Sequence, residues 1–169
     1  MKIYGIAGKA RSGKDTVADI IIKHYQNKKV VIYPCTKYLK DYVMKISDWS
    51  GEDETKPRDL LQNLGKKIKE KYPDFFTKRI EEDLKVFSNY CDIIIVTGLR
   101  LIPELELLKN NYNSTIIKVE NKANNGLTEK QRNDITEQDV DKYENYDFII
   151  ENNGDKTELE NKIKNIIEE

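Results

Sequence analysis

The stretch from Gly8 to Thr16, with the sequence GKARSGKDT, constrains the fold of this chain more than any other part of the sequence. It follows the apolar run 3–7, which predicts a buried strand, and it precedes the apolar run 17–22, which predicts the start of a helix. Glycine has no Cβ, so the backbone at Gly8 and Gly13 can approach a bound group closely. A strand, a glycine-bounded loop with a lysine and a helix form the context in which such a loop binds phosphate.

This predicted phosphate-binding loop (P-loop) offers two kinds of positive charge to an anion. Its backbone N–H groups and the positive end of the following helix face the phosphate. Lys14 adds a mobile point charge for the terminal phosphates. We therefore predict a nucleotide-binding cradle made of Gly8, Ala10, Arg11, Ser12, Gly13, Lys14, Asp15 and Thr16.

The residue after Lys14 departs from the usual pattern, in which a Ser or Thr contacts Mg²⁺. Asp15 stands there, and Thr16 comes one residue later. A carboxylate is a better ligand for a hard cation than a hydroxyl, so we predict that Asp15 is linked to Mg²⁺, directly or through water. The alternative is a carboxylate that only interacts with the helix dipole.

Length and charge limit the classes of function. The chain has 169 residues, which suits one domain with a sizeable core. Its 29 basic and 30 acidic residues nearly cancel, which argues against a nucleic-acid-binding arm or a membrane-surface helix. No apolar stretch is long enough to span a bilayer. We therefore expect neither a nucleic acid nor a membrane as a partner.

The cysteines and the histidine indicate no disulfide and no zinc site. Cys35 and Cys91 lie far apart in the sequence, and His24 is the only histidine. The predicted strand and P-loop occupy the N-terminus, which leaves no room for a secretory signal. We expect a cytoplasmic protein.

Five apolar runs alternate with amphipathic segments along the chain. The expected strands cover residues 3–7, 30–33, 91–97, 115–119 and 146–150. This alternation predicts an α/β fold in which a five-stranded, mainly parallel sheet is covered by helices on both faces. Residues 121–141 are polar and rich in Asn, so we expect a mobile excursion there rather than an element of the core.

Several polar residues are expected near the P-loop, because ligands of open parallel sheets lie at the carboxyl edge of the strands. Lys37 comes shortly after the second expected strand, and Arg100 follows the most apolar one. Arg58 and Gln62 are one helical turn apart, so they share a face that can present a guanidinium fork and an amide to an acceptor. Surface positions for Arg58 and Gln62 are the alternative.

Three further arginines are weaker candidates. Arg11 lies inside the P-loop, within reach of a donor or acceptor phosphate. Arg79 resembles Arg58, but Lys78 beside it indicates an ordinary charged helix face. Arg132 lies in the polar excursion, and a lid that carries an arginine onto the phosphates would exclude water and stabilise developing charge. A solvated arginine is the alternative at each position.

Six stretches carry a resemblance to a known family: AGKARSGKDTVAD at 7–19, RDLLQNLG at 58–65, PDFFTKR at 73–79, IVTGLR at 95–100 followed by PE at 103–104, DITE at 134–137 and DFIIENNG at 147–154. As a set they resemble the phage-type deoxynucleoside monophosphate kinases over nearly the whole chain. The resemblance implies a P-loop NTPase fold in a single kinase domain over 1–169. It also implies an acceptor-binding helical region at about 36–90 and a lid at about 121–141.

The resemblance further implies an activity, namely transfer of the γ-phosphoryl of ATP, with Mg²⁺, to a (deoxy)nucleoside monophosphate. Such transfer depends on positioning and on charge neutralisation. The catalytic candidates are therefore Lys14, Arg11, Arg100 and Arg132. The acceptor-binding candidates are Lys37, Arg58, Gln62, Arg79 and Arg100. The oligomeric state stays open, with a homodimer as one option.

Two alternatives remain open. The first is a nucleotide-binding protein that no longer transfers phosphate. It is suggested by Gly98, which stands where this family has an Asp that helps to hold Mg²⁺ or to orient the acceptor. Animal-type phosphomevalonate kinases share a similar G-K-x-x-S-G-K-D loop, a P-x-F-F segment and an I-E-N-x-G end, so a small phosphorylated acid is the second candidate acceptor. The segment 47–57 is also shorter than in phage members, which leaves the preference for a base open.

Overall fold

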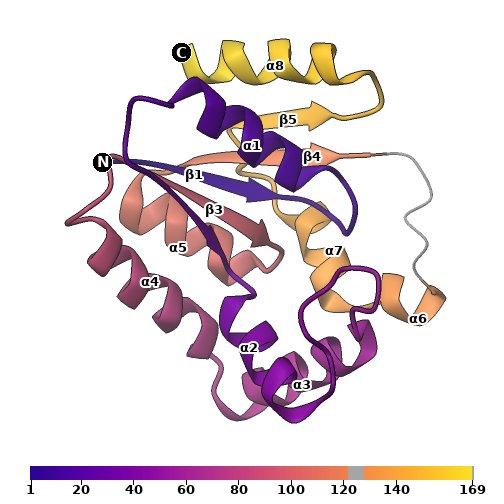
Figure 1. The fold of residues 1–169 in the computed structure, drawn as a ribbon. Coiled ribbons are helices and arrows are strands. Elements are labelled where there is room, and N and C mark those ends of the chain that lie inside the picture. Colours follow the sequence, from indigo (N-terminus) through magenta and orange to yellow (C-terminus); the bar gives the residue numbers. More distant parts are fainter. Residues whose placement is uncertain (122–127, 169) are drawn as a thin grey trace.

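A five-stranded parallel sheet forms the centre of the molecule (Figure 1). The computed structural model describes residues 1–121 and 128–168. The strands are β1 (Lys2–Ala7), β2 (Val30–Pro34), β3 (Ile93–Leu99), β4 (Thr115–Glu120) and β5 (Phe148–Glu151). Their order is β2-β3-β1-β4-β5, and each adjacent pair is parallel. The expected α/β class with a five-stranded parallel sheet is therefore confirmed.

Helices cover both faces of the sheet, as expected (Figure 1). One face packs against α1 (Lys14–His24) and α8 (Lys156–Glu168), and the other packs against α4 (Phe75–Phe87) and α5 (Ile102–Tyr112). Beyond the carboxyl ends of the strands lie α2 (Lys37–Ile46) and α3 (Arg58–Lys71), with α6 (Glu129–Arg132) and α7 (Ile135–Lys142) beside them. No helix in the part of the chain that the structure describes is long and apolar enough to cross a membrane.

The hydrophobic core consists of two layers separated by the sheet. Alternate residues of β3 serve the two layers, with Ile93 and Ile95 in the cluster under α1 and α8, and Ile94 and Val96 in the cluster under α4 and α5. A strand buried on both faces must be apolar throughout, which explains the run Ile93–Val96. A third, smaller cluster joins α2 to α3 and does not reach the sheet layers.

The expected polar excursion at 121–141 is corrected in part by the structure. Residues 122–127, including Gly126, lie outside the described residues. The rest of the segment contains α6 and α7, and Glu137, Asp139 and Val140 of α7 are buried. Hydropathy underestimates such a helix, because two of its three buried side chains are acidic, and the buried carboxylate of Glu137 is held by polar contacts with Ala10 and Arg100.

Candidate active site

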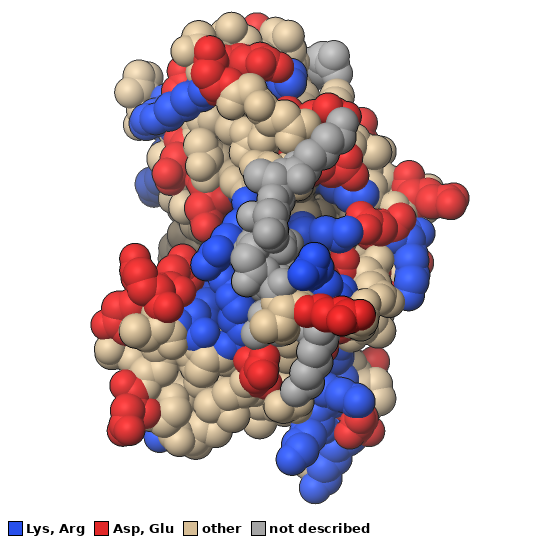
Figure 2. Space-filling view, turned by 90° about the vertical axis from the view of Figure 1, so that its right-hand side faces the viewer, with Lys and Arg blue, Asp and Glu red and all other residues tan. Residues whose placement is uncertain are grey.

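A cavity of about 920 Å³ opens at the carboxyl ends of the strands. Its wall is formed by the P-loop, the ends of β2 and β3, helices α2 and α3, and the start of α7. Figure 2 shows Lys and Arg side chains gathered around the hollow on this face. The wall includes Lys14 and Arg11 of the P-loop together with Arg58 and Arg100, so residues predicted from three separate stretches of the sequence do line one space.

The P-loop needs glycine at two positions for steric reasons. Gly8 has a φ of 146°, and a Cβ there would lie 2.4 Å from the backbone oxygen of Val119. Gly13 has a φ of 98°, and a Cβ there would lie 2.2 Å from Nδ2 of Asn152. Both positive φ values and both approaches disfavour any side chain. The loop is thus packed against the ends of β4 and β5, as its predicted role as a rigid cradle requires.

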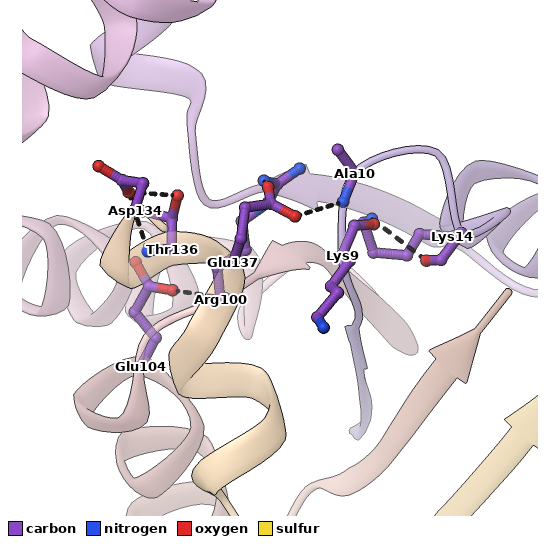
Figure 3. Close-up of polar contacts among 9 residues, drawn as sticks. Lys9, Ala10, Lys14, Arg100, Glu104, Asp134, Thr136 and Glu137 are labelled. Carbon is purple, nitrogen blue, oxygen red and sulfur yellow. Dashed lines mark hydrogen bonds and ion pairs between the residues drawn. The ribbon is translucent and has the colours of Figure 1, made fainter. Parts of the chain in front are cut away.

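Lys14 is buried within the loop that it serves. Its Nζ donates to the backbone oxygen of Lys9 at 2.5 Å and to Oγ of Ser12 at 3.4 Å (Figure 3). Burial, together with the positive charge of Arg100, lowers the pKa of Lys14 from its ordinary value of 10.5 to about 7, although Asp15 and Glu137 oppose the shift. A phosphate bound in the cradle would supply a negatively charged partner for the ammonium group of Lys14.

A carboxylate from α7 contacts the P-loop directly. Oε2 of Glu137 accepts a hydrogen bond from the backbone N–H of Ala10 at 3.0 Å, and Oε1 forms an ion pair with Nη1 of Arg100 (Figure 3). Glu137 is only 3% exposed. Sequence reasoning included this residue in the lid resemblance but gave it no role.

The start of helix α7 is marked by a capping signal in the sequence. Asp134 is its N-cap, and its Oδ1 accepts hydrogen bonds from the backbone N–H of Thr136 at 2.9 Å and from Oγ1 of Thr136 at 2.7 Å. Asp is a strong N-cap residue, so the pattern Asp134-x-Thr136 predicts a helix start. That start places Glu137 in the first turn, facing the loop.

Arg100 is held from both sides at the end of β3. Its guanidinium contacts Glu137, and its backbone N–H donates to Oε2 of Glu104 at 3.1 Å. The same oxygen accepts from the backbone N–H of Leu101 at 3.2 Å. Burial raises the pKa of Glu104 above its ordinary value, and these two donors oppose the shift.

The side of the cavity that carries Arg58 combines positive charge with apolar side chains. Burial lowers the pKa of Arg58 from its ordinary value, and the positive charges of Arg11 and Arg100 lower it further, so the three guanidinium groups act on the same space. Gln62 lies one turn from Arg58 in the same wall, as expected. Leu39, Leu61 and Phe76 contribute the apolar part.

Four lysines that sequence reasoning missed belong to the same wall, namely Lys40, Lys56, Lys66 and Lys69. Lys40 lies on α2, and Lys56 precedes α3 and forms an ion pair of 3.2 Å with Asp53. Burial lowers the pKa of Lys56, and the charge of Lys40 adds to that effect. No motif identifies these residues, because an exposed and a cavity-lining lysine look alike in a charged sequence.

Three of the predicted catalytic and acceptor-binding residues are not among the described residues that line the cavity. Nζ of Lys37 lies 3.8 Å from Oδ2 of Asp83. Arg79 forms an ion pair of 2.6 Å with Glu82 on its own helix. Arg132 lies on α6 with an exposed side chain. Their assignment to catalysis or acceptor binding stays a prediction, without support from the shape of this cavity.

Gly98 is the extra residue of a bulge in β3. Ile6 of β1 pairs with Thr97, and the next residue, Ala7, pairs with Leu99, so Gly98 has no partner in β1. Its φ is 76°, and a Cβ there would meet nothing within 4 Å. The strand therefore continues past the expected end at 97, and a side chain at this position would point into open space of the cavity.

The residues of the wall fit a magnesium ion bound together with phosphate. Asp15 lies in the wall next to Lys14. Within the described ranges, no group of three or more His, Cys, Asp or Glu side chains is arranged to hold a metal ion. Mg²⁺ commonly uses one or two carboxylates and takes its other ligands from substrate phosphates and water, so a single carboxylate here is sufficient.

The fold is that of P-loop kinases. The chain superposes on shikimate kinase from Aquifex aeolicus with a TM-score of 0.52 and 19% identity, covering 99% of this chain and 96% of that one. It superposes on dephospho-CoA kinase from Campylobacter jejuni with a TM-score of 0.55 and 13% identity, with the same coverage of the two chains. At these identities the likeness defines the fold alone.

Sequence comparison gives one distant relative. No protein-family model matches the chain. A Methanocaldococcus jannaschii protein named "Putative molybdopterin-guanine dinucleotide biosynthesis adapter protein" is 33% identical over 130 residues, which cover 69% of this chain and 51% of that protein. The chain thus spans about half the length of the curated relative that it matches.

Proposed function

We propose that this chain is an ATP-dependent phosphotransferase whose acceptor is a (deoxy)nucleoside monophosphate. One observation carries the proposal: Lys14 of the phosphate cradle shares a cavity of about 920 Å³ with Arg11, Arg58 and Arg100. Transfer between two phosphates needs a donor cradle and several cations around the moving group. The cavity is at the upper end of the size range typical of ligand sites.

Each part of the wall has a role in this proposal. The N–H groups of the P-loop and Lys14 bind the donor phosphates, and Arg11 and Arg100 neutralise charge on the transferred group. Mg²⁺ would neutralise further charge on the donor phosphates, with Asp15 as the residue that holds it. Arg58 binds the acceptor phosphate with its planar fork, and the amide of Gln62 is placed to hydrogen-bond the rest of the acceptor.

A panel of acceptors tests the proposal. Purified protein is incubated with ATP–Mg²⁺ and each nucleoside and deoxynucleoside monophosphate, and ADP release is measured. We expect turnover with at least one of them and a loss of several orders of magnitude in Lys14→Ala. Arg58→Ala should raise the KM for the acceptor at least tenfold and leave the KM for ATP nearly unchanged. Lys67→Ala, an exposed change on the same helix, is the matched control.

A small phosphorylated acid is the second candidate acceptor. Lys40 and Lys56 place two further positive charges in the acceptor wall, and these suit an acceptor with a carboxylate in addition to its phosphate. Phosphomevalonate belongs in the same panel for this reason. Turnover of phosphomevalonate and of no nucleotide would replace the first proposal with this one.

A nucleotide-binding protein without transfer activity is the third candidate. Gly98 leaves the cavity wall without a carboxylate at a position where nothing obstructs one. The name of the Methanocaldococcus jannaschii relative, an adapter protein, agrees with such a role. This candidate predicts tight nucleotide binding, no turnover with any acceptor and no rescue by Gly98→Asp. Asp tolerates a positive φ better than most residues, so that variant is a fair test.

A further inference from the structure

The carboxylate of Glu137 occupies donors that a phosphate would need. The N–H of Ala10 is one of the backbone groups of the cradle, and Arg100 is a proposed ligand of the transferred phosphoryl group. Both contact Glu137 in this structure, at Oε2 and Oε1 respectively. Carboxylate and phosphate oxygens accept hydrogen bonds from the same donors with similar geometry, so the two anions compete for one place.

Burial makes this competition strong. Glu137 is 3% exposed, so water screens its charge little. A phosphate beside an immobile carboxylate would meet an unscreened like charge. Phosphate binding at the Ala10 end of the loop therefore requires that the side chain of Glu137 moves away.

Helix α7 is held to the loop by contacts that can be exchanged. Asp141 forms ion pairs with Lys9 at 2.5 Å and with Lys118 at 3.2 Å, and its side chain is 49% exposed. The pair with Lys9 is exposed at both side chains and contributes little stability, whereas the Lys118 side chain is buried. By contrast, Val140 is fully buried and anchors the helix. The first turn of α7 can therefore shift without unfolding the helix.

We propose that Glu137 is an internal anion of the phosphate cradle, which nucleotide phosphates must displace before Arg100 can contact the transferred group. The inference rests on the proposed function in one respect, because it takes a nucleotide as the competing ligand. In this proposal the position of α7 depends on which anion contacts Ala10 and Arg100, the carboxylate of Glu137 or a phosphate. Glu137 is a positioning residue in this scheme, acting on the reaction through Arg100.

The test compares Glu137→Gln with Glu144→Gln. Both remove one negative charge, but Glu144 lies in the exposed segment after α7. ADP and pyrophosphate serve as probes, with affinities measured by calorimetry and folding checked by circular dichroism. The substitution removes the charge that competes with phosphate for Ala10 and Arg100. The Kd of Glu137→Gln should therefore be at least tenfold lower than that of the wild type for both probes. Glu144→Gln should bind like the wild type.

The possible outcomes separate the two proposals. If the wild type binds ADP and Glu137→Gln binds it equally or more weakly, Glu137 only supports the loop, and this inference is wrong while the proposed function stands. If neither protein binds ADP or pyrophosphate, both proposals fail. Amide hydrogen exchange of the wild type gives a readout without any substitution. ADP should change the protection of residues 134–142, and unchanged protection would also overturn the inference.

Discussion

At the scale of the residue, the burial of Lys14 makes a prediction about stability and pH. The pKa of Lys14 is about 7 in the folded chain and 10.5 when the chain is unfolded. Below pH 7 the lysine is charged in both states, so the folded state carries the full cost of burying the charge. Between pH 7 and 10.5 the unfolded state binds more protons, so stability rises with pH.

We therefore expect Lys14→Met to be more stable than the wild type at pH 6 and to lose this advantage as the pH approaches 10. The difference should shrink by about 1.4 kcal/mol per pH unit at most. Urea unfolding of both proteins, without nucleotide and without metal, measures it. Lys23→Met, an exposed change on the same helix, should show no such trend. A constant difference between pH 6 and 10 would contradict the burial of the charge.

Alanine substitutions at two glycines, Gly8 and Gly98, distinguish the cost of a steric clash from the cost of backbone strain. At Gly8 an added Cβ meets a backbone oxygen at 2.4 Å, whereas at Gly98 it meets nothing within 4 Å, and φ is positive at both. Gly98→Ala should lower the free energy of unfolding by about 1 kcal/mol, the cost of a left-handed conformation. Gly8→Ala should cost about 3 kcal/mol, because a clash adds to the strain. Chemical denaturation measures both, and equal costs would mean that the loop is not packed against β4.

Sequence patterns predicted the candidate residues that can be recognised from their spacing within one short stretch. The two glycines, Lys14 and Asp15 follow from the spacing of one loop, and Arg58 and Gln62 follow from one helical turn. Glu137 and Lys56 could not be predicted in this way. Their place in the cavity depends on how distant elements pack. Glu137 falls in the DITE stretch of the lid resemblance, but no pattern gave it or Lys56 a role in the site.

At the scale of the element, α2 and α3 form a unit with its own small core. Val43, Trp49 and Leu61 make up its buried cluster, apart from the two layers at the sheet. A small cluster buries little apolar area, so this unit should open more readily than the sheet. The unit carries Lys40, Arg58 and Gln62 of the cavity wall, and its local stability should therefore affect the proposed acceptor site more than the proposed donor site.

Val43→Ala and Val17→Ala test this separation. Both valines are fully buried, and each change should cost about 2 kcal/mol. Val43→Ala should raise the KM for the acceptor several-fold with little change for ATP, while Val17→Ala, in the layer under α1, should lower only global stability. Trp49 is the only tryptophan, so its fluorescence reports the opening of the unit in urea. Equal effects of both variants on the acceptor would argue against an independent unit.

At the scale of the whole molecule, the order of the strands is the feature that the sequence could not supply. Alternating apolar runs predict how many strands there are and that they are parallel. They do not predict that β1 lies between β3 and β4. The pairs β1–β3 and β1–β4 join residues that are about ninety or more positions apart in the sequence. The most apolar strand, β3, is interior, and β1 takes the middle position, which places the P-loop at the centre of the carboxyl edge.

One contact links the end of the chain to its beginning. Nδ2 of Asn152, just after β5, donates to the backbone oxygen of Ser12 in the P-loop at 3.0 Å, while its backbone N–H donates to the oxygen of Glu120 at 2.7 Å. The cradle therefore depends on the C-terminal strand having docked. Asn152→Ala should cost about 1 kcal/mol of stability for the lost hydrogen bond and should weaken ADP binding several-fold, because Ser12 and Gly13 lose their support. Asn153→Ala is the control, since the Asn153 side chain is exposed and its Nδ2 donates to Oε2 of Glu151 at 3.3 Å. If both variants bind ADP like the wild type, the loop keeps its shape without the C-terminal strand, and the long-range contact is a consequence of the fold rather than a condition for the cradle.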